Sequence, residues 1–135
     1  MVKQVIIMRK DLGMRKGKMI AQGAHASMKV FFDIMRQSKV ILDGGDIQEA
    51  YSLFPVTSEM EEWINGPFTK IVVYVQSEKQ LMDIYKQAKE ADLPCSLIVD
   101  AGKTEFSGKP TKTCCAIGPA NNTDIDKITS NLPLL

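Results

Sequence analysis

Short apolar segments rich in β-branched residues alternate along this chain with segments of helical period. The apolar segments are residues 2–8 (VKQVIIM), 69–75 (TKIVVYV), 95–100 (CSLIVD) and 113–118 (TCCAIG), the last closed by Pro119. Each has the length of a buried strand, and helical segments separate the first three. This alternation predicts an α/β domain with a largely parallel sheet and helices on both faces. The dozen residues before the last strand have no helical pattern, which favours an antiparallel return.

The expected helices lie between and after these strands. The longest runs from Lys18 to about Arg36, and its apolar stripe consists of Ile20, Ala24, Met28, Phe31 and Met35. The others are a short helix over 47–54 after a turn at 43–46, one from a Ser58–Glu61 capping box through Ile64, one starting at Ser77 and ending before Leu93–Pro94, and one over 124–130 capped by Asn122 or Thr123.

Positive charge is concentrated at the start of the chain, although the net charge is only +1. Residues 1–40 contain nine basic and two acidic side chains, whereas residues 41–66 contain six acidic and no basic ones. A segregated basic segment is typical of proteins that bind a polyanion. A solvated basic surface without a partner would have the same pattern.

Length and composition restrict the class of protein. A chain of 135 residues is expected to form one domain over 1–135. No apolar run approaches the ~20 residues that span a bilayer, and the stretch over 5–8 is too short for a signal peptide, so we expect a soluble, cytoplasmic protein with no membrane partner. Cys95, Cys114 and Cys115 lack the spacing of a disulfide framework or a zinc site and are expected to be reduced thiols. We expect no metal and no cofactor.

The loop after the first strand is basic and rich in glycine. It resembles a nucleotide-binding loop but departs from that motif, because its glycines stand one residue too close together and Met19 follows Lys18 where a hydroxyl residue is required. A helix start flanked by Arg15, Lys16 and Lys18 still suits a phosphate, including one of a nucleic acid.

A polar stripe continues from this loop along the first helix. Lys18, Gln22, His25 and Lys29 fall within about 60° of one another, on the side opposite the apolar stripe. These side chains are candidates for a site at the helix start. A plain amphipathic helix with a solvated face is the alternative interpretation, and a single histidine does not decide between the two.

The loop after the third strand carries the second group of candidates. Asp100 follows a buried strand, where a carboxylate is costly unless it is paired or used. Lys103 and Thr104 follow it closely, and Thr113 opens the return strand. An aspartate near hydroxyls and a lysine can position water or a hydroxyl for attack on an ester. An aspartate that only caps the turn remains an alternative.

Four blocks of this sequence are similar to those of the type II peptidyl-tRNA hydrolases. They are KGKMIAQGAHA (16–26), WINGPFTKIVV (63–73), SLIVDAGKT (96–104) and TCCAIGP (113–119). The resemblance extends from residue 3 to about 132 except for one region, an acidic insert at about 36–62 that is longer than the usual connection. Smaller departures are Ser27 in place of a common alanine and the pair Cys114–Cys115 in place of ordinary apolar residues.

The resemblance implies a three-layer α/β/α sandwich on a mixed four-stranded sheet, no metal, and often a homodimer. It implies hydrolysis of the ester that joins a peptidyl group to the 3′-terminal ribose of tRNA, with peptidyl-tRNA as the partner. The family's functional positions fall on Lys18, Gln22, His25, Asp100, Thr104 and Thr113. Sequence-independent contacts to the tRNA backbone are expected from Arg15, Lys16, Lys29 and Lys103.

The expected mechanism is attack by a positioned water that Asp100 orients or deprotonates. In it, Lys18 stabilises the oxyanion or holds the terminal phosphate, and a covalent threonine intermediate is the weaker option. The main alternative function is a catalytically silent regulator of the same fold that binds RNA or protein. A small-molecule enzyme unrelated to tRNA and a deacylase that edits mischarged tRNA are further alternatives.

Overall fold

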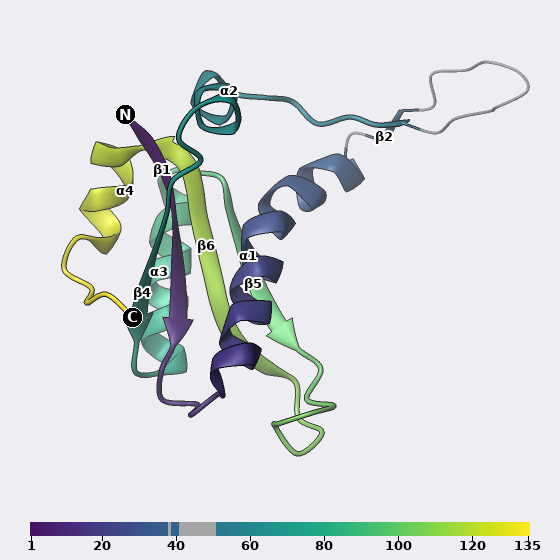
Figure 1. Ribbon diagram of the computed structural model, residues 1–135, viewed down its shortest axis with the longest axis vertical. Coiled ribbons are helices and arrows are strands. Elements are labelled where there is room, and N and C mark those ends of the chain that lie inside the picture. The colour runs from purple at the N-terminus through teal and green to yellow at the C-terminus, as the bar shows by residue number, and fades with distance from the viewer. Residues whose placement is uncertain (38, 41–50) are drawn as a thin grey trace, which may run out of the picture.

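The computed structural model describes residues 1–37, 39–40 and 51–135 (Figure 1). Its elements are, in chain order, β1 (Val2–Arg9), α1 (Lys16–Gln37), β2 (Lys39–Val40), β3 (Tyr51–Ser52), α2 (Ser58–Asn65), β4 (Lys70–Val75), α3 (Glu78–Glu90), β5 (Cys95–Asp100), β6 (Thr111–Asn121) and α4 (Asn122–Thr129). No helix in the described ranges is long and apolar enough to cross a membrane.

The main sheet has four strands in the order β4-β1-β6-β5. β1 is parallel to β4, whereas β6 is antiparallel to both β1 and β5, so three strands share one direction and the sheet is mixed, as the family resemblance implies. The predicted antiparallel return of the last strand is confirmed. The carboxyl ends of β1, β4 and β5 all lie at the same end of the sheet, which is where sites form in α/β folds.

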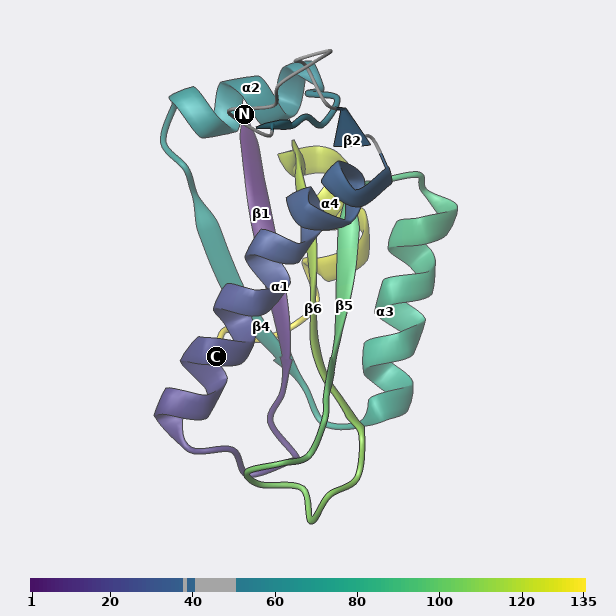
Figure 2. The same cartoon turned by 90° about the vertical axis from the view of Figure 1, so that its right-hand side faces the viewer.

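Two apolar layers hold helices on opposite faces of the sheet, which gives the expected α/β/α sandwich (Figures 1 and 2). On one face Leu81 and Ile84 of α3 and Ile125 of α4 pack against β1, β4 and β6. On the other face Ala26 and Val30 of α1 pack against β1, β5 and β6. Burying a large aliphatic side chain of this kind contributes roughly 1.5–3 kcal/mol to stability.

The predicted core stripe of α1 was wrong for half of the helix. Ile20 is 74% exposed and Met28 is 52% exposed, and Ala24 is exposed as well. Small residues of α1, including Gly23, pack against the sheet instead. A Cβ added to Gly23 would lie 3.8 Å from the side chain of Met8. A pattern of large apolar side chains does not predict the buried face of a helix that packs closely through small residues.

Phe31 and Met35, the remaining members of that stripe, are partly buried. Phe31 stacks on Trp63 of α2, with ring centroids 5.9 Å apart, and Trp63 donates from its indole nitrogen to the carbonyl of Thr69 at 2.7 Å. The outer half of the stripe therefore packs against α2.

Several predicted element bounds were wrong. β6 continues through Pro119, which the sheet accommodates by a register shift of β1 between Lys3 and Val5. α2 is capped by Thr57, whose hydroxyl accepts from the Met60 amide at 3.1 Å, so Ser58 is not the cap. α4 begins at Asn122 after Asn121, which provides no side-chain cap, so the caps expected from Asn122 or Thr123 are absent.

The segment of the acidic insert is described only in part. Tyr51–Ser52 forms β3, which pairs with β2, and residues 53–54 are not helical, so the helix expected over 47–54 is wrong at its four described positions. Residues 47–50 of that helix and the turn expected at 43–46 lie outside the described residues.

Candidate active site

Three segments far apart in sequence meet where β5 ends and β6 begins. α1 crosses both strands, and the loop 101–110 between them lies beside the start of α1 (Figure 2). This brings together five of the six predicted catalytic residues, which we call the Asp100 cluster: Lys18, Gln22, Asp100, Thr104 and Thr113. The cluster joins positions about 80–90 residues apart through side-chain hydrogen bonds alone.

The Asp100 carboxylate is at the centre and is only 13% exposed. Its Oδ1 accepts from Lys18 Nζ at 2.8 Å and from Gln22 Nε2 at 3.3 Å, and its Oδ2 accepts from the Gly102 amide at 2.9 Å. The hydrogen bond from Lys18 is the main reason why the pKa of Asp100 lies below its ordinary value. Asp100 is therefore a stable anion and a weak base, better suited to orienting a water than to deprotonating it.

The Lys18 ammonium connects the carboxylate of Asp100 with the hydroxyl of Thr104. It donates to Asp100 and, at 3.0 Å, to Thr104 Oγ1. An ammonium has three donors, so one is left for a substrate atom. Because the Thr104 hydroxyl accepts from Lys18 and is exposed, its own proton is free to donate to a substrate or a water.

Gln22 and Thr113 form the buried floor of the cluster. Gln22 is 2% exposed, and its Oε1 accepts from the Thr113 hydroxyl at 2.5 Å, which leaves its Nε2 facing Asp100. Thr113 is the extra residue of a β-bulge, since Ile98 pairs with Cys114 while Val99 pairs with Lys112. The Thr113 hydroxyl is fully buried and already donates, so it is poorly placed to act as a nucleophile.

The loop 101–110 is shaped to hold the Gly102 amide and Thr104 in place. Gly102 has φ +79°, and a Cβ there would run into the backbone of Lys109. The Gly108 amide donates to the Gly102 carbonyl at 2.9 Å and closes the loop. Arg15 Nε donates to Glu105 at 2.9 Å, which ties the loop to the start of α1.

The remaining predicted site residues lie around this cluster. Lys16 and Lys103 are exposed and have no ion pair among the described residues. Arg15 and Lys29 are paired, with Glu105 and with Asp33 at 2.6 Å respectively. His25 is exposed, and no hydrogen bond or ion pair joins it to the described part of the chain, so the structure does not bring it into the cluster.

Two contributors were missed by the sequence analysis. The Gly102 amide could have been found, because an aspartate followed two residues later by glycine is typical of a turn in which the carboxylate accepts from the backbone. Glu105 gave no such signal, since its partner Arg15 is 90 residues away.

The described residues hold no group of three or more histidine, cysteine or carboxylate side chains arranged for a metal ion. The three cysteines are free thiols. Burial raises the pKa of Cys114 to about 12, and its thiol donates to the Gln22 carbonyl at 3.3 Å. Cys114 is therefore a packing residue below the cluster and not a nucleophile.

Comparisons with known proteins agree along the whole chain. A family model described as peptidyl-tRNA hydrolase PTH2 matches residues 2–135. A protein named peptidyl-tRNA hydrolase from Methanocaldococcus jannaschii is 42% identical over 99% of this chain and 100% of its own length. One of the same name from Nanoarchaeum equitans is 39% identical over 99% of each chain.

A solved structure adds a likeness of fold. It is a protein of unknown function, Atu0240, from Agrobacterium tumefaciens strain C58. It superposes with a TM-score of 0.57 over 99% of this chain and 97% of its own, at 15% identity. At that identity the likeness concerns the fold alone.

Proposed function

The chain belongs to the peptidyl-tRNA hydrolase PTH2 family and is an ester hydrolase that acts on peptidyl-tRNA, and we propose that the Asp100 cluster is its catalytic group. The reaction cleaves the ester between the peptidyl group and the 3′-terminal ribose, which frees the tRNA. One observation carries the assignment: the Lys18 ammonium lies between Asp100 and Thr104 at 2.8 and 3.0 Å, with one donor left.

In the proposed mechanism a water attacks the ester carbonyl. Oδ1 of Asp100 already accepts two hydrogen bonds, whereas Oδ2 accepts one, so Oδ2 is the atom that orients the water. The free donor of Lys18 stabilises the oxyanion that forms on the carbonyl oxygen. The bond from carbon to the ribose oxygen then breaks, and one proton of the water ends on that oxygen.

Gln22 and Thr113 are positioning residues in this proposal, because they hold the carboxylate without facing solvent. Thr104 contacts the substrate or the water through its free proton. His25 touches substrate outside the cluster, further along α1.

The first test compares two substrates. N-acetylaminoacyl-tRNA and free aminoacyl-tRNA carry the same ester, but only the first resembles a peptidyl group. We expect hydrolysis of the N-blocked ester at least tenfold faster, measured as release of the acyl group. Equal rates on both would favour an editing deacylase, and turnover of neither would favour a silent regulator.

We assign tRNA contacts to the exposed cations around the cluster. Lys16 and Lys103 have no acidic partner in the described residues, and they flank the cluster from α1 and from the loop 101–110. Arg15 and Lys29 contribute only if a phosphate displaces Glu105 or Asp33. Because its substrate forms during translation, we assign the enzyme to the cytoplasm.

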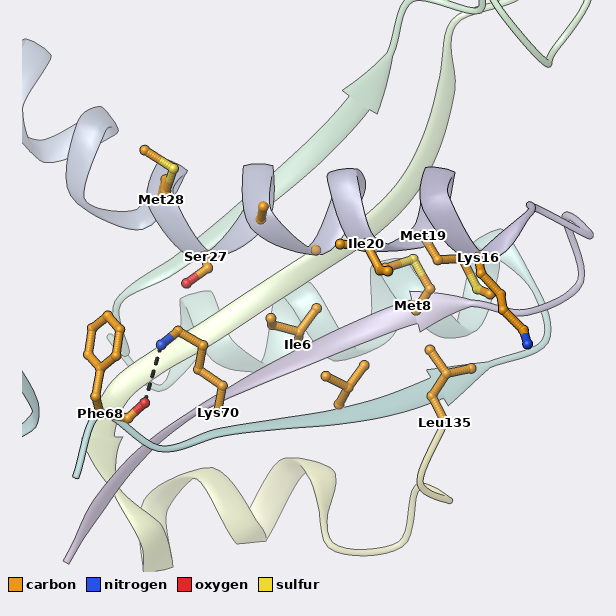
Figure 3. A pocket seen from close by; sticks show the side chains of 13 residues that line it. Ile6, Met8, Lys16, Met19, Ile20, Ser27, Met28, Phe68, Lys70 and Leu135 are labelled. Atoms are coloured by element: carbon orange, nitrogen blue, oxygen red, sulfur yellow. Dashed lines mark hydrogen bonds between the residues drawn. The ribbon is translucent and has the colours of Figure 1, made fainter.

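We also assign the chain to a homodimer, through the side of α1 that faces away from the cluster. Ile20, Met28 and Phe32 are exposed there, beside exposed Ile64 and Phe68. A groove of about 700 Å³ runs along this side between α1, β1 and β4 (Figure 3). An exposed apolar surface of this extent is typical of a protein interface.

A second copy is the occupant that we assign to this surface. Around a twofold axis the same exposed apolar residues of α1 and α2 would meet their own copies, which buries the apolar surface of both subunits at once. Ile20→Glu should give a monomer in light scattering, while Gln87→Glu on α3 should not. A monomeric wild type would contradict the dimer.

A further inference from the structure

β5 is an edge strand, and it leads directly into the Asp100 cluster. In the order β4-β1-β6-β5 it pairs only with β6, and within the described residues no strand pairs with its other edge. Its last residue is Asp100 itself. A chain lying along this edge would therefore arrive at the catalytic carboxylate.

The register shows which backbone groups are available on that edge. The Gly118 amide donates to the Pro94 carbonyl at 2.7 Å, so Pro94 faces β6 and the alternation of an antiparallel pair turns Ser96 and Ile98 the same way. Cys95 and Leu97 consequently direct their N–H and C=O groups away from β6. No hydrogen bond to these backbone groups is present in the described part of the chain.

A helix face and a cavity border the same edge. Lys18 binds Asp100 at the end of β5, and Lys29 lines a cavity of about 590 Å³ together with Cys95 at its start. The polar stripe of α1 thus runs alongside β5, with His25 between the two ends. The cavity lies between α1 and α3 beside the start of β5, at the end of the strand opposite the cluster.

The chemistry of the substrate matches a main-chain recognition surface. Peptidyl groups differ in their side chains and share only their backbone, so an enzyme that accepts many of them gains most from backbone hydrogen bonds. Unpaired N–H and C=O groups on a strand edge provide these independently of sequence.

We propose that the peptidyl group binds as an extended strand parallel to β5, with its ester at the Asp100 cluster and its amino end toward the cavity beside Cys95. The direction follows from the chemistry, because the esterified residue is the carboxyl end of the peptide and β5 also ends at the cluster. This inference rests on the proposed function and adds to it the mode of recognition of the peptide half.

The distance along β5 from Asp100 to each free backbone group determines which peptide residue that group can bind. Leu97 precedes Asp100 by three residues, about 10 Å along a strand. The Leu97 groups therefore meet the third or fourth peptide residue counted back from the ester, and the Cys95 groups meet the fifth or sixth. Peptides of one or two residues do not reach these groups.

The first experiment varies the substrate and keeps the wild-type enzyme. Peptidyl-tRNAs with one to seven residues of alanine and glycine are hydrolysed, and kcat and KM are measured for each. We expect kcat/KM to rise about tenfold or more between two and six residues and then to level off, mainly through KM. N-methylation of single amides at the third to sixth residues should lower kcat/KM about fivefold at the paired positions and leave the others unchanged.

The second experiment removes a donor from the edge. Leu97→Pro deletes the outward N–H, which an edge strand tolerates, and Leu97→Val keeps the N–H while trimming the same side chain. In Leu97→Pro the rise of kcat/KM with peptide length should be lost, whereas Leu97→Val should keep it. Both should hydrolyse N-acetylaminoacyl-tRNA like the wild type, which also reports that they are folded.

The outcomes separate this inference from the proposed function. Rates independent of peptide length and of N-methylation, with N-acetylaminoacyl-tRNA still hydrolysed, would overturn the strand-edge inference alone. Absence of hydrolysis for every substrate would overturn the proposed function itself. If Leu97→Pro fails to fold, the N-methylation series on the wild type decides.

Discussion

Lys18 and Lys16 stand two residues apart, yet their surroundings give them different roles. Lys18 is 16% exposed and held by Asp100 and Thr104, whereas Lys16 is exposed and has no ion pair among the described residues. Lys18→Ala should lower kcat about 100-fold or more and change tRNA affinity little, because an oxyanion donor is lost. Lys16→Ala should weaken binding and keep kcat. Filter binding and single-turnover hydrolysis separate the two effects, and equal losses of affinity with unchanged turnover in both would reduce Lys18 to a phosphate contact.

The lowered pKa of Asp100 fixes the sign of its pH dependence. A carboxylate whose pKa falls on folding stabilises the native state above its unfolded value of about 3.9, and that stabilisation is lost as the pH falls through the folded pKa. Asp100 therefore remains ionised at all higher pH. The ratio of the wild-type rate to the Asp100→Asn rate should stay constant from about pH 5 to 7. A ratio that declines as the pH falls through about 6 would indicate that the pKa of Asp100 is raised and that Asp100 acts as a general base.

At the scale of single elements, the loop 101–110 allows a matched comparison of two glycines. Gly102 and Gly108 both have positive φ, +79° and +76°, but only at Gly102 does an added Cβ meet backbone, whereas at Gly108 nothing lies within 4 Å. Gly102→Ala should lower kcat at least tenfold, because it displaces the amide that binds Asp100. Gly108→Ala should cost about 1 kcal/mol of stability and little activity. Equal kcat values in the two variants would show that the Gly102 amide does not position Asp100 for catalysis.

The elements also show what sequence patterns could predict. The four main strands were predicted from their β-branched runs, and the polar stripe of α1 together with the Asp100 loop identified the cluster. The burial of Gln22 and the exposure of Ile20 were not predicted, because they depend on close packing of small residues against the sheet. The bulge at Thr113 was not predictable either, since it arises from the pairing of two strands and not from the residue itself.

For the whole molecule, the uneven charge predicts a salt-dependent association with tRNA. If about three to five phosphates are contacted, the slope of log affinity against log salt should be about −2 to −4. Lys16→Ala with Lys103→Ala should flatten the slope by about 1–2 units, and Lys86→Ala on α3, across the sheet from α1, should leave it unchanged. A flat response of the wild type would contradict a basic surface that binds tRNA.

A further whole-molecule prediction concerns metal ions. The proposed reaction uses a water, Asp100 and Lys18, so hydrolysis of a short pre-folded acceptor-stem substrate should persist in excess chelator. The substrate is chosen so that magnesium is not needed to fold the RNA. Loss of activity that returns on adding a divalent ion would show that a metal takes part.

Single-turnover hydrolysis of N-acetylaminoacyl-tRNA by the wild type and by Asp100→Asn shows whether the Asp100 cluster hydrolyses peptidyl-tRNA. The substitution keeps the shape of the side chain and removes the charge that pairs with Lys18 and that we propose to orient the water. We expect a rate lower by roughly 10²–10⁴ in a variant that remains folded by circular dichroism and still binds tRNA. A folded Asp100→Asn variant with a rate near that of the wild type would contradict a catalytic role of the cluster.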